Sequence, residues 1–151
     1  VKRLAADPVA LELAIWFHDV IYDGRRHDNE ERSAGFAENS LSRMGASELL
    51  RAQVRRLILL TRHDAAPPTL DGQLMVDIDL ASLGIRPEAF DENGLAIRQE
   101  YAHVSEAEFH RARADLLGRF LSRPRIYYTD VFHERYERQA RQNLERVTAG
   151  A

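Results

Sequence analysis

The sequence contains no cysteine and no long apolar run, and its charges nearly balance. Without cysteine there is no disulfide framework and no thiolate zinc site. No apolar stretch reaches the length of a membrane span, and the start at Val1 leads into no signal-peptide core. The 21 basic and 24 acidic residues are well mixed and leave no basic stripe for duplex DNA or RNA. We therefore expect a cytoplasmic protein that binds neither nucleic acid nor a membrane.

What the chain does contain is enough apolar sequence for a core, because 44% of its 151 residues are hydrophobic and 30% are charged. Apolar periodicity predicts helices nearly everywhere and no strand. We expect an all-α fold, a single-domain bundle of about six to seven helices over residues 1–151. The expected helices are Pro8–Tyr22, Asp28 to about Gly45, Ser47 to about Thr61, Asp71–Leu83, Pro87–Tyr101, Ser105 to before Pro124, and Thr129–Val147.

Several helix starts carry capping signals. Asp7 followed by Pro8 is typical of an N-cap and a first helical residue. Ser105 and Glu108 form a capping-box pattern. The first expected helix is apolar on most sides, which is typical of a central helix. We expect Trp16 and Val20 to fill one of its buried faces.

Three His-Asp dipeptides occur in the chain, and only one lies inside this apolar helix. They are His18-Asp19, His27-Asp28 and His63-Asp64. Burying an ionised carboxylate beside an imidazole costs several kcal/mol unless a counter-charge or a metal compensates. No Lys or Arg lies within one turn of the first pair. A divalent cation held by nitrogen and oxygen ligands satisfies both groups, and Mn, Fe, Ni, Co, Mg and Zn all suit such ligands. The alternative is a core His bonded to a backbone carbonyl and an Asp paired with a distant Arg.

The motifs around this pair resemble a known superfamily. The segment Trp16–Asp23 is similar to the signature of the HD superfamily of metal-dependent phosphohydrolases. The segment Asp28–Ala34 resembles one branch of it, the bacterial HD proteins described as predicted phosphohydrolases. The similarity continues in order through Thr61–His63, Asp77–Gly84, Arg98–Tyr101 and Ala140–Leu144, and so covers nearly the whole chain.

The resemblance implies a metal held by a first His, by His18 and Asp19, and by a later Asp. That Asp is Asp79, with Asp77 in reserve. The two side chains point about 200° apart on a helix, so only one faces the ion. The other is then expected to be an exposed carboxylate. The first His belongs on an earlier helix, which we expect before Val1; an incomplete site is the alternative.

Two further residues are candidates for a catalytic role. His63 follows the apolar face of the third expected helix, Ser47 to about Thr61, and is a candidate auxiliary ligand or phosphate contact. The alternative is a His with no function, since a helix C-terminus favours a His through the helix dipole alone. Asp23 lies about 40° around the helix from Asp19. Its position resembles that of acidic residues just after the pair in some superfamily members, and this resemblance makes it a candidate for orienting the attacking water. Its alternative is a turn residue before Gly24.

Candidate substrate contacts lie later in the chain. Arg98 and Tyr101 share a helix face at i and i+3, where they suit a substrate phosphate. The alternative is an Arg98 that pairs with Glu100 or Asp91 on the surface. The basic face of the last helix, with Arg135, Arg138 and Arg141 balanced by glutamates, is typical of a solvated surface.

The resemblance implies metal-dependent hydrolysis of a small phosphate ester, with nucleotides as the substrate class of the relatives. Two other functions stay open: a catalytically inactive nucleotide-binding or regulatory module, and a helical interaction domain whose charged last helix docks a partner. The expected partner is a small phosphorylated molecule, and a homo-oligomer is compatible with the sequence.

Overall fold

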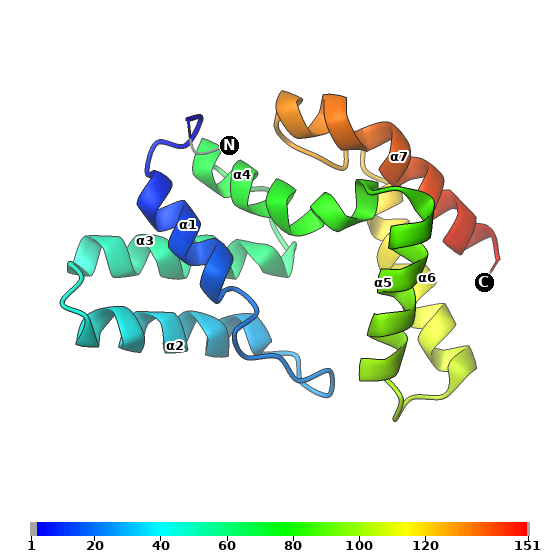
Figure 1. The fold of residues 1–151 in the computed structure, drawn as a ribbon, viewed down its shortest axis with the longest axis horizontal. Helices are drawn as coiled ribbons and strands as arrows, with labels where there is room; N and C mark the ends of the chain where they lie inside the picture. The colour runs from blue at the N-terminus through cyan, green and yellow to red at the C-terminus, as the bar shows by residue number, and fades with distance from the viewer. Residues whose placement is uncertain (1–2, 151) are drawn as a thin grey trace. The chain divides into compact units, whose positions relative to one another are not determined.

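The computed structural model describes residues 3–150, and every regular element within them is helical (Figure 1). The α-helices are α1 (Pro8–Phe17), α2 (Asn29–Arg43), α3 (Glu48–Leu59), α4 (Leu70–Asp79), α5 (Pro87–Glu100), α6 (Glu106–Leu121) and α7 (Asp130–Ala149); the 3-10 helices are η1 (Leu60–Arg62) and η2 (Leu80–Gly84). The expected all-α fold is confirmed. The chain divides into two compact units, the first ending at Asp79 and the second beginning at Leu80.

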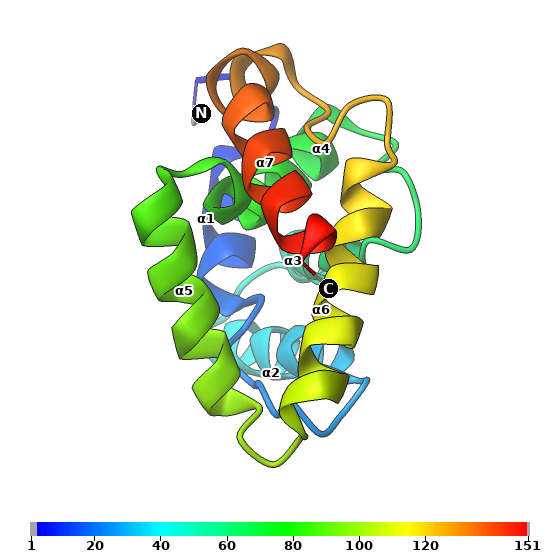
Figure 2. The ribbon, with the colours of Figure 1, turned by 90° about the vertical axis from the view of Figure 1, so that its right-hand side faces the viewer.

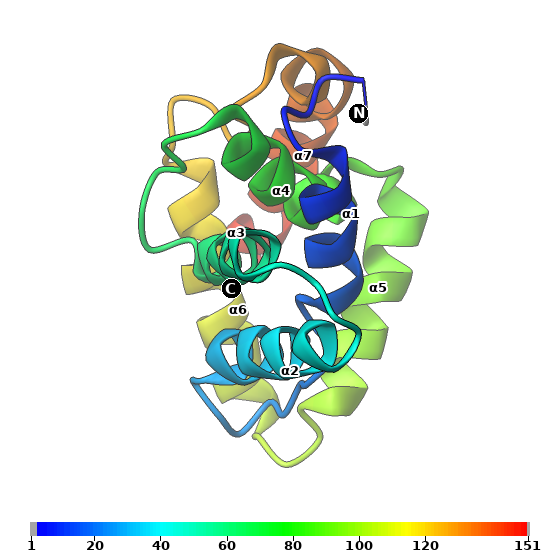
Figure 3. The same ribbon diagram turned by 90° about the vertical axis from the view of Figure 1, so that its left-hand side faces the viewer.

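In the first unit, α2 and α3 lie side by side, and α1 packs across α3 (Figure 3). Helix α4 contacts both α1 and α3. Gly45, with a φ of 77°, turns the chain between α2 and α3 in the left-handed region that glycine adopts without strain. The core of this unit is aliphatic and includes Leu11, Ala14, Ala37, Val54, Ile58 and Leu74.

Helix α1 begins as the sequence predicts. The Asp7 carboxylate accepts hydrogen bonds from the backbone N–H groups of Val9 and Ala10, and Pro8 is the first helical residue. The segment before it is held by α4, because the buried carboxylate of Asp71 accepts from the N–H groups of Ala6 and Asp7 at 2.7 and 2.9 Å.

The end of α1 differs from the prediction. The helix ends at Phe17 instead of Tyr22, and His18 is its C-cap. Residues beyond it bond to α2: the Ser33 hydroxyl accepts from Ile21 N–H and donates to Ile21 O. These side-chain bonds hold the chain beyond Phe17 in a non-helical loop, which takes Val20 out of the helix. The expected second buried face does not form, and Trp16 points to solvent from within α1. Trp16 is 76% exposed and Val20 is 45% exposed.

In the second unit, α7 packs against α6 and η2, and α5 contacts α7 and η2 (Figure 2). Gly84 closes η2 where the chain approaches α7 so closely that a Cβ would lie 2.6 Å from the Cβ of Tyr136. The Asn143 amide on α7 donates to the carbonyls of Leu83 and Ile85. Glycine and asparagine thus fix this turn against α7.

The expectation of a solvated basic face on α7 is wrong for Arg141. Its guanidinium donates to Glu137 and to the carbonyls of Leu121, Arg123 and Pro124. These carbonyls follow or end α6 and would otherwise be without helical partners.

Within residues 3–150, no helix is both long and apolar enough to cross a membrane.

Candidate metal centre

Three side chains of the first unit converge at the C-terminal ends of α1 and α4. His18 caps α1, Asp19 follows it, and Asp79 is the last residue of α4. His18 Nε2 lies 3.3 Å from Asp19 Oδ2 and 3.3 Å from Asp79 Oδ1. One ligand atom from each residue lies within 4.8 Å of the other two. We call these three residues the metal cluster, because they are candidate ligands of one ion.

The surroundings of the metal cluster are partly open. The side chains of His18 and Asp79 are each 20% exposed, whereas that of Asp19 is 62% exposed. The expectation that both members of the pair are buried is therefore wrong for Asp19. The physical reason is the early end of α1, which leaves Asp19 outside the helix. Among the described residues, the ion-pair partners of Asp19 and Asp79 are histidines, not arginines or lysines.

The ring of His18 is oriented by its own helix. Its Nδ1 lies 2.8 Å from the carbonyl oxygen of Ile15, to which it donates. In the neutral ring this fixes the proton on Nδ1 and leaves the Nε2 lone pair directed at the two carboxylates. Metal-binding histidines are commonly held in this way, with the other ring nitrogen bonded to a carbonyl or carboxylate.

Two carboxylates that face one imidazole leave an excess of negative charge. The hydrogen bond to Asp79 is the largest influence on His18; burial opposes it and the charge of Asp19 adds to it, and the pKa of His18 is raised from 6.5 to about 9. Partial burial raises the pKa of the Asp19 carboxyl, with the His18 charge acting against it. The cluster therefore holds a proton tightly at Nε2, which is the position a metal ion would take.

The distances suit a single cation. Metal ligands at 2.0–2.2 Å are about 2.8–3.1 Å from their nearest neighbours in octahedral geometry and about 3.3–3.6 Å in tetrahedral geometry. The two 3.3 Å separations fall within the tetrahedral range. They are also longer than a charge-assisted N–H···O bond, for which about 2.7–2.9 Å is usual. A nitrogen and two carboxylate oxygens fit Mn, Fe, Co, Ni, Zn or Mg.

Of the two candidate aspartates on α4, Asp79 joins the metal cluster and Asp77 does not. Asp77 is fully buried, so the expectation that the second carboxylate is exposed is wrong. The helical spacing is the reason: two residues on, the side chain points to nearly the opposite side of α4, and that side faces the interior of the unit.

His63 also reaches Asp79. Its Nε2 lies 2.7 Å from Asp79 Oδ2, and its side chain is 14% exposed. Burial alone would raise the pKa of the Asp79 carboxyl, but the hydrogen bonds from His18 and His63 outweigh it and hold that pKa below its usual value. Asp79 is thus ionised, with one oxygen toward each histidine.

Asp23 is placed as a turn residue. It lies in the loop beyond α1 and is exposed, and its Oδ1 accepts from the backbone N–H of Arg25. The Asn29 side chain bonds both the N–H and the carbonyl of Asp23. The expected helical relation between Asp23 and Asp19 is wrong, since α1 ends before both residues. A role for Asp23 in orienting water stays a prediction.

Arg98 and Tyr101 belong to the second unit. The Arg98 guanidinium donates to the carbonyls of Tyr101 and Val104, at 2.6 and 3.0 Å, and lies over the ring of Phe109. It therefore closes the C-terminal end of α5. The alternative pairing with Asp91 is not the arrangement found, because Asp91 accepts from Arg146. A substrate contact by Arg98 or Tyr101 stays a prediction.

The sequence analysis assigned no role to Ser33 or Asn29, although both lie in the quoted motif Asp28–Ala34. Their side chains hold the loop that follows the metal cluster, through the backbone of Ile21 and Asp23. The only available signal was a pair of small polar residues near the start of a helix. Nothing in the sequence tells which backbone groups they bind.

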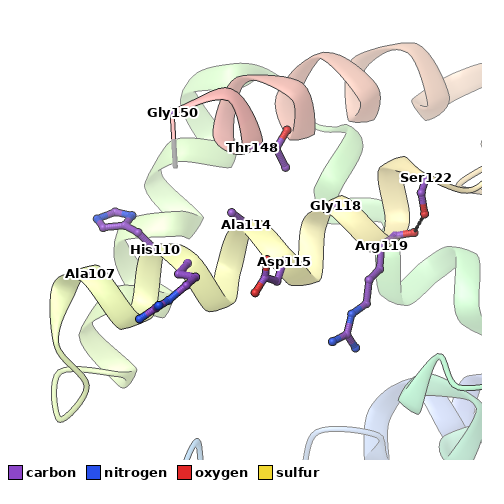
Figure 4. Close-up of a pocket in the computed structure, with 10 residues that line it drawn as sticks. Ala107, His110, Ala114, Asp115, Gly118, Arg119, Ser122, Thr148 and Gly150 are labelled. Atoms are coloured by element: carbon purple, nitrogen blue, oxygen red, sulfur yellow. Dashed lines mark hydrogen bonds between the residues drawn. The ribbon is translucent and has the colours of Figure 1, made fainter.

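The second unit has a groove of its own (Figure 4). It runs along α6 and the end of α7, and Ala114, Gly118 and Thr148 line it beside the charged Asp115 and Arg119.

Over residues 3–150, the metal cluster is the one group of three His, Asp or Glu side chains spaced to hold an ion. Comparison of the chain with protein-family models, with curated proteins and with solved structures found no match.

Proposed function

We propose that this protein is a metal-dependent phosphohydrolase of the HD type that acts on a small phosphate ester, with nucleotides as the first substrate class to test. The observation that carries the proposal is the convergence of Asp19 and Asp79 on the Nε2 atom of His18. The similarity of the surrounding motifs to the HD superfamily supports the choice of reaction.

Each residue of the metal cluster has a definite part in this function. His18 offers Nε2 because Nδ1 is engaged with Ile15 O. Asp79 offers Oδ1 because Oδ2 is engaged with His63. A bound divalent cation supplies Lewis acidity toward a phosphoryl oxygen and lowers the pKa of water. Asp19, at 62% exposure, lies on the side of the cluster that is open to solvent.

This openness supports a catalytic site over a structural one. Structural metal sites are closed by four protein ligands, whereas catalytic sites leave a position for water or substrate. The metal cluster supplies three ligands from the described residues, and one of them is largely exposed. A small phosphate ester can therefore approach the ion without any rearrangement of the core.

The test is hydrolysis of nucleoside mono-, di- and triphosphates by protein loaded with Mn²⁺. We expect phosphate release by the wild type and its loss in His18→Ala and Asp19→Ala, both of which retain the helical fold. His27→Ala is the matched control, since His27 belongs to another His-Asp dipeptide and is exposed. Turnover that survives both cluster substitutions would contradict the proposal. Binding of metal and nucleotide without turnover would favour a catalytically inactive nucleotide-binding module. Absence of metal binding would favour a helical interaction domain.

A further inference from the structure

His63 lies beside the metal cluster but is not spaced as part of it. Its Nε2 is 2.7 Å from Asp79 Oδ2, yet within residues 3–150 no fourth His, Asp or Glu joins His18, Asp19 and Asp79 at the 4.8 Å spacing. A direct ligand to the same ion would have to satisfy that spacing. His63 touches the cluster through Asp79.

The two oxygens of Asp79 are divided between two histidines. Oδ1 faces His18 Nε2 at 3.3 Å, and Oδ2 faces His63 Nε2 at 2.7 Å. An ionised carboxylate only accepts hydrogen bonds, so the proton of the shorter contact is on His63 Nε2. This bond fixes the rotation of the carboxylate group and keeps Oδ1 turned toward His18.

The backbone of His63 is also unusual. With a φ of 56° and a ψ of 22°, it is the one residue other than glycine with a positive φ in the described chain. Left-handed conformation is unfavourable for most residues with a Cβ, and such positions cluster at functional sites. Here it ends η1 and accompanies a side chain that reaches back to α4.

We infer that His63 is a positioning residue, which donates a hydrogen bond from Nε2 to Asp79 Oδ2 and so presents Asp79 Oδ1 to the metal ion without binding the ion itself. The inference rests on the proposed metal site. Ligating carboxylates are commonly held by such a second hydrogen bond, and loss of one lowers metal affinity about 10–100-fold.

The experiment compares Zn²⁺ affinity, by titration calorimetry, for the wild type, His63→Asn and His63→Gln. Asn tolerates the left-handed backbone but ends short of Asp79, so it removes the bond without adding strain. The Gln amide nitrogen reaches about as far as Nε2 and restores the donor. We expect one ion per chain in all three, an affinity about 10–100-fold lower in His63→Asn, and recovery of most of it in His63→Gln.

Nitrogen NMR of the zinc-loaded wild type separates positioning from ligation. We expect a metal-bound shift for His18 Nε2 and a protonated Nε2 for His63. A metal-bound nitrogen on His63, equal affinity of His63→Asn and wild type, or no recovery in a His63→Gln chain that is folded by circular dichroism would each overturn the inference. A wild type that binds no Zn²⁺ would overturn both the proposed metal site and the role of His63. The results above, in a wild type that does bind Zn²⁺, would overturn the role of His63 alone.

Discussion

Each unit holds a carboxylate largely away from solvent, Asp79 in the first and Glu137 in the second. Glu137 has an arginine among its ion-pair partners, whereas those of Asp79 among the described residues are histidines. Glu137 accepts from the backbone N–H groups of Ile126 and Tyr127 and from Arg141, and His133 Nδ1 lies 3.3 Å from its Oε2. Asp79 has two histidines as partners, and one of these also faces Asp19.

This difference in partners separates a structural network around Glu137 from a candidate metal site around Asp79. Burial alone would raise the pKa of Glu137, but permanent donors outweigh it and hold that pKa below its usual value. Its negative charge is matched by a fixed cation. In the metal cluster, the negative charge of the two carboxylates is balanced only when His18 carries a proton. A metal ion could take the place of that proton. Ionisable groups perturbed in this way are more common at functional sites than elsewhere, which makes the cluster a candidate.

The largest effect should follow the substitution Asp79→Asn. The amide keeps the shape of the carboxylate but removes the charge that faces His18 Nε2 and His63 Nε2. We expect Zn²⁺ affinity to fall by more than the about 10–100-fold that loss of a supporting residue causes, since Asp79 is itself a proposed ligand. Titration calorimetry measures this. Wild-type affinity in a folded Asp79→Asn chain would show that the ion is held elsewhere.

The matched substitution in the second unit is Glu137→Gln. It leaves one buried amide group facing backbone N–H donors and removes the partner of Arg141, so we expect a loss of about 2–4 kcal/mol in the free energy of unfolding. Urea denaturation measures it through the transition midpoint. Zn²⁺ affinity of the folded chain should not change. A stability loss as large in Asp79→Asn as in Glu137→Gln would erase the contrast between the units.

Several helix starts and one residue of the candidate site could be predicted from local sequence, whereas the buried network of Glu137 could not. The caps Asp7 and Ser105 were predicted and are found, because a cap bonds within three residues of itself. The choice of Asp79 over Asp77 as the neighbour of His18 and Asp19 agrees with helical spacing combined with the resemblance.

Most of what could not be predicted depends on partners distant in sequence. The early end of α1 follows from bonds that Ser33 makes to Ile21, 12 residues away. The contact of His63 with Asp79 spans 16 residues and a left-handed turn. Neither leaves a periodic signal. The role of Arg141 was missed for the same reason, since its carbonyl partners lie 17 to 20 residues away. The partners of Arg98 are local, three and six residues on, but they are backbone carbonyls, and the sequence does not distinguish them from a side-chain partner.

A smaller effect is expected in the pH dependence of the metal-free protein. Because the pKa of His18 is raised from 6.5 to about 9, its stabilisation is complete below pH 6.5 and is lost as the pH rises through about 9. The partly exposed ring limits this to about 2 kcal/mol or less. Thermal unfolding in the presence of a chelator from pH 6 to 10 measures it. His18→Ala should lack this part of the decline, and an identical decline in that variant would assign it to other groups.

The central claim is that His18, Asp19 and Asp79 hold one divalent cation, and anomalous diffraction from crystals grown with Mn²⁺ tests it most directly. We predict one anomalous peak at about 2.0–2.2 Å from His18 Nε2 and from one oxygen of each aspartate. No anomalous peak there, in crystals of the folded protein that contain Mn²⁺, would contradict the claim.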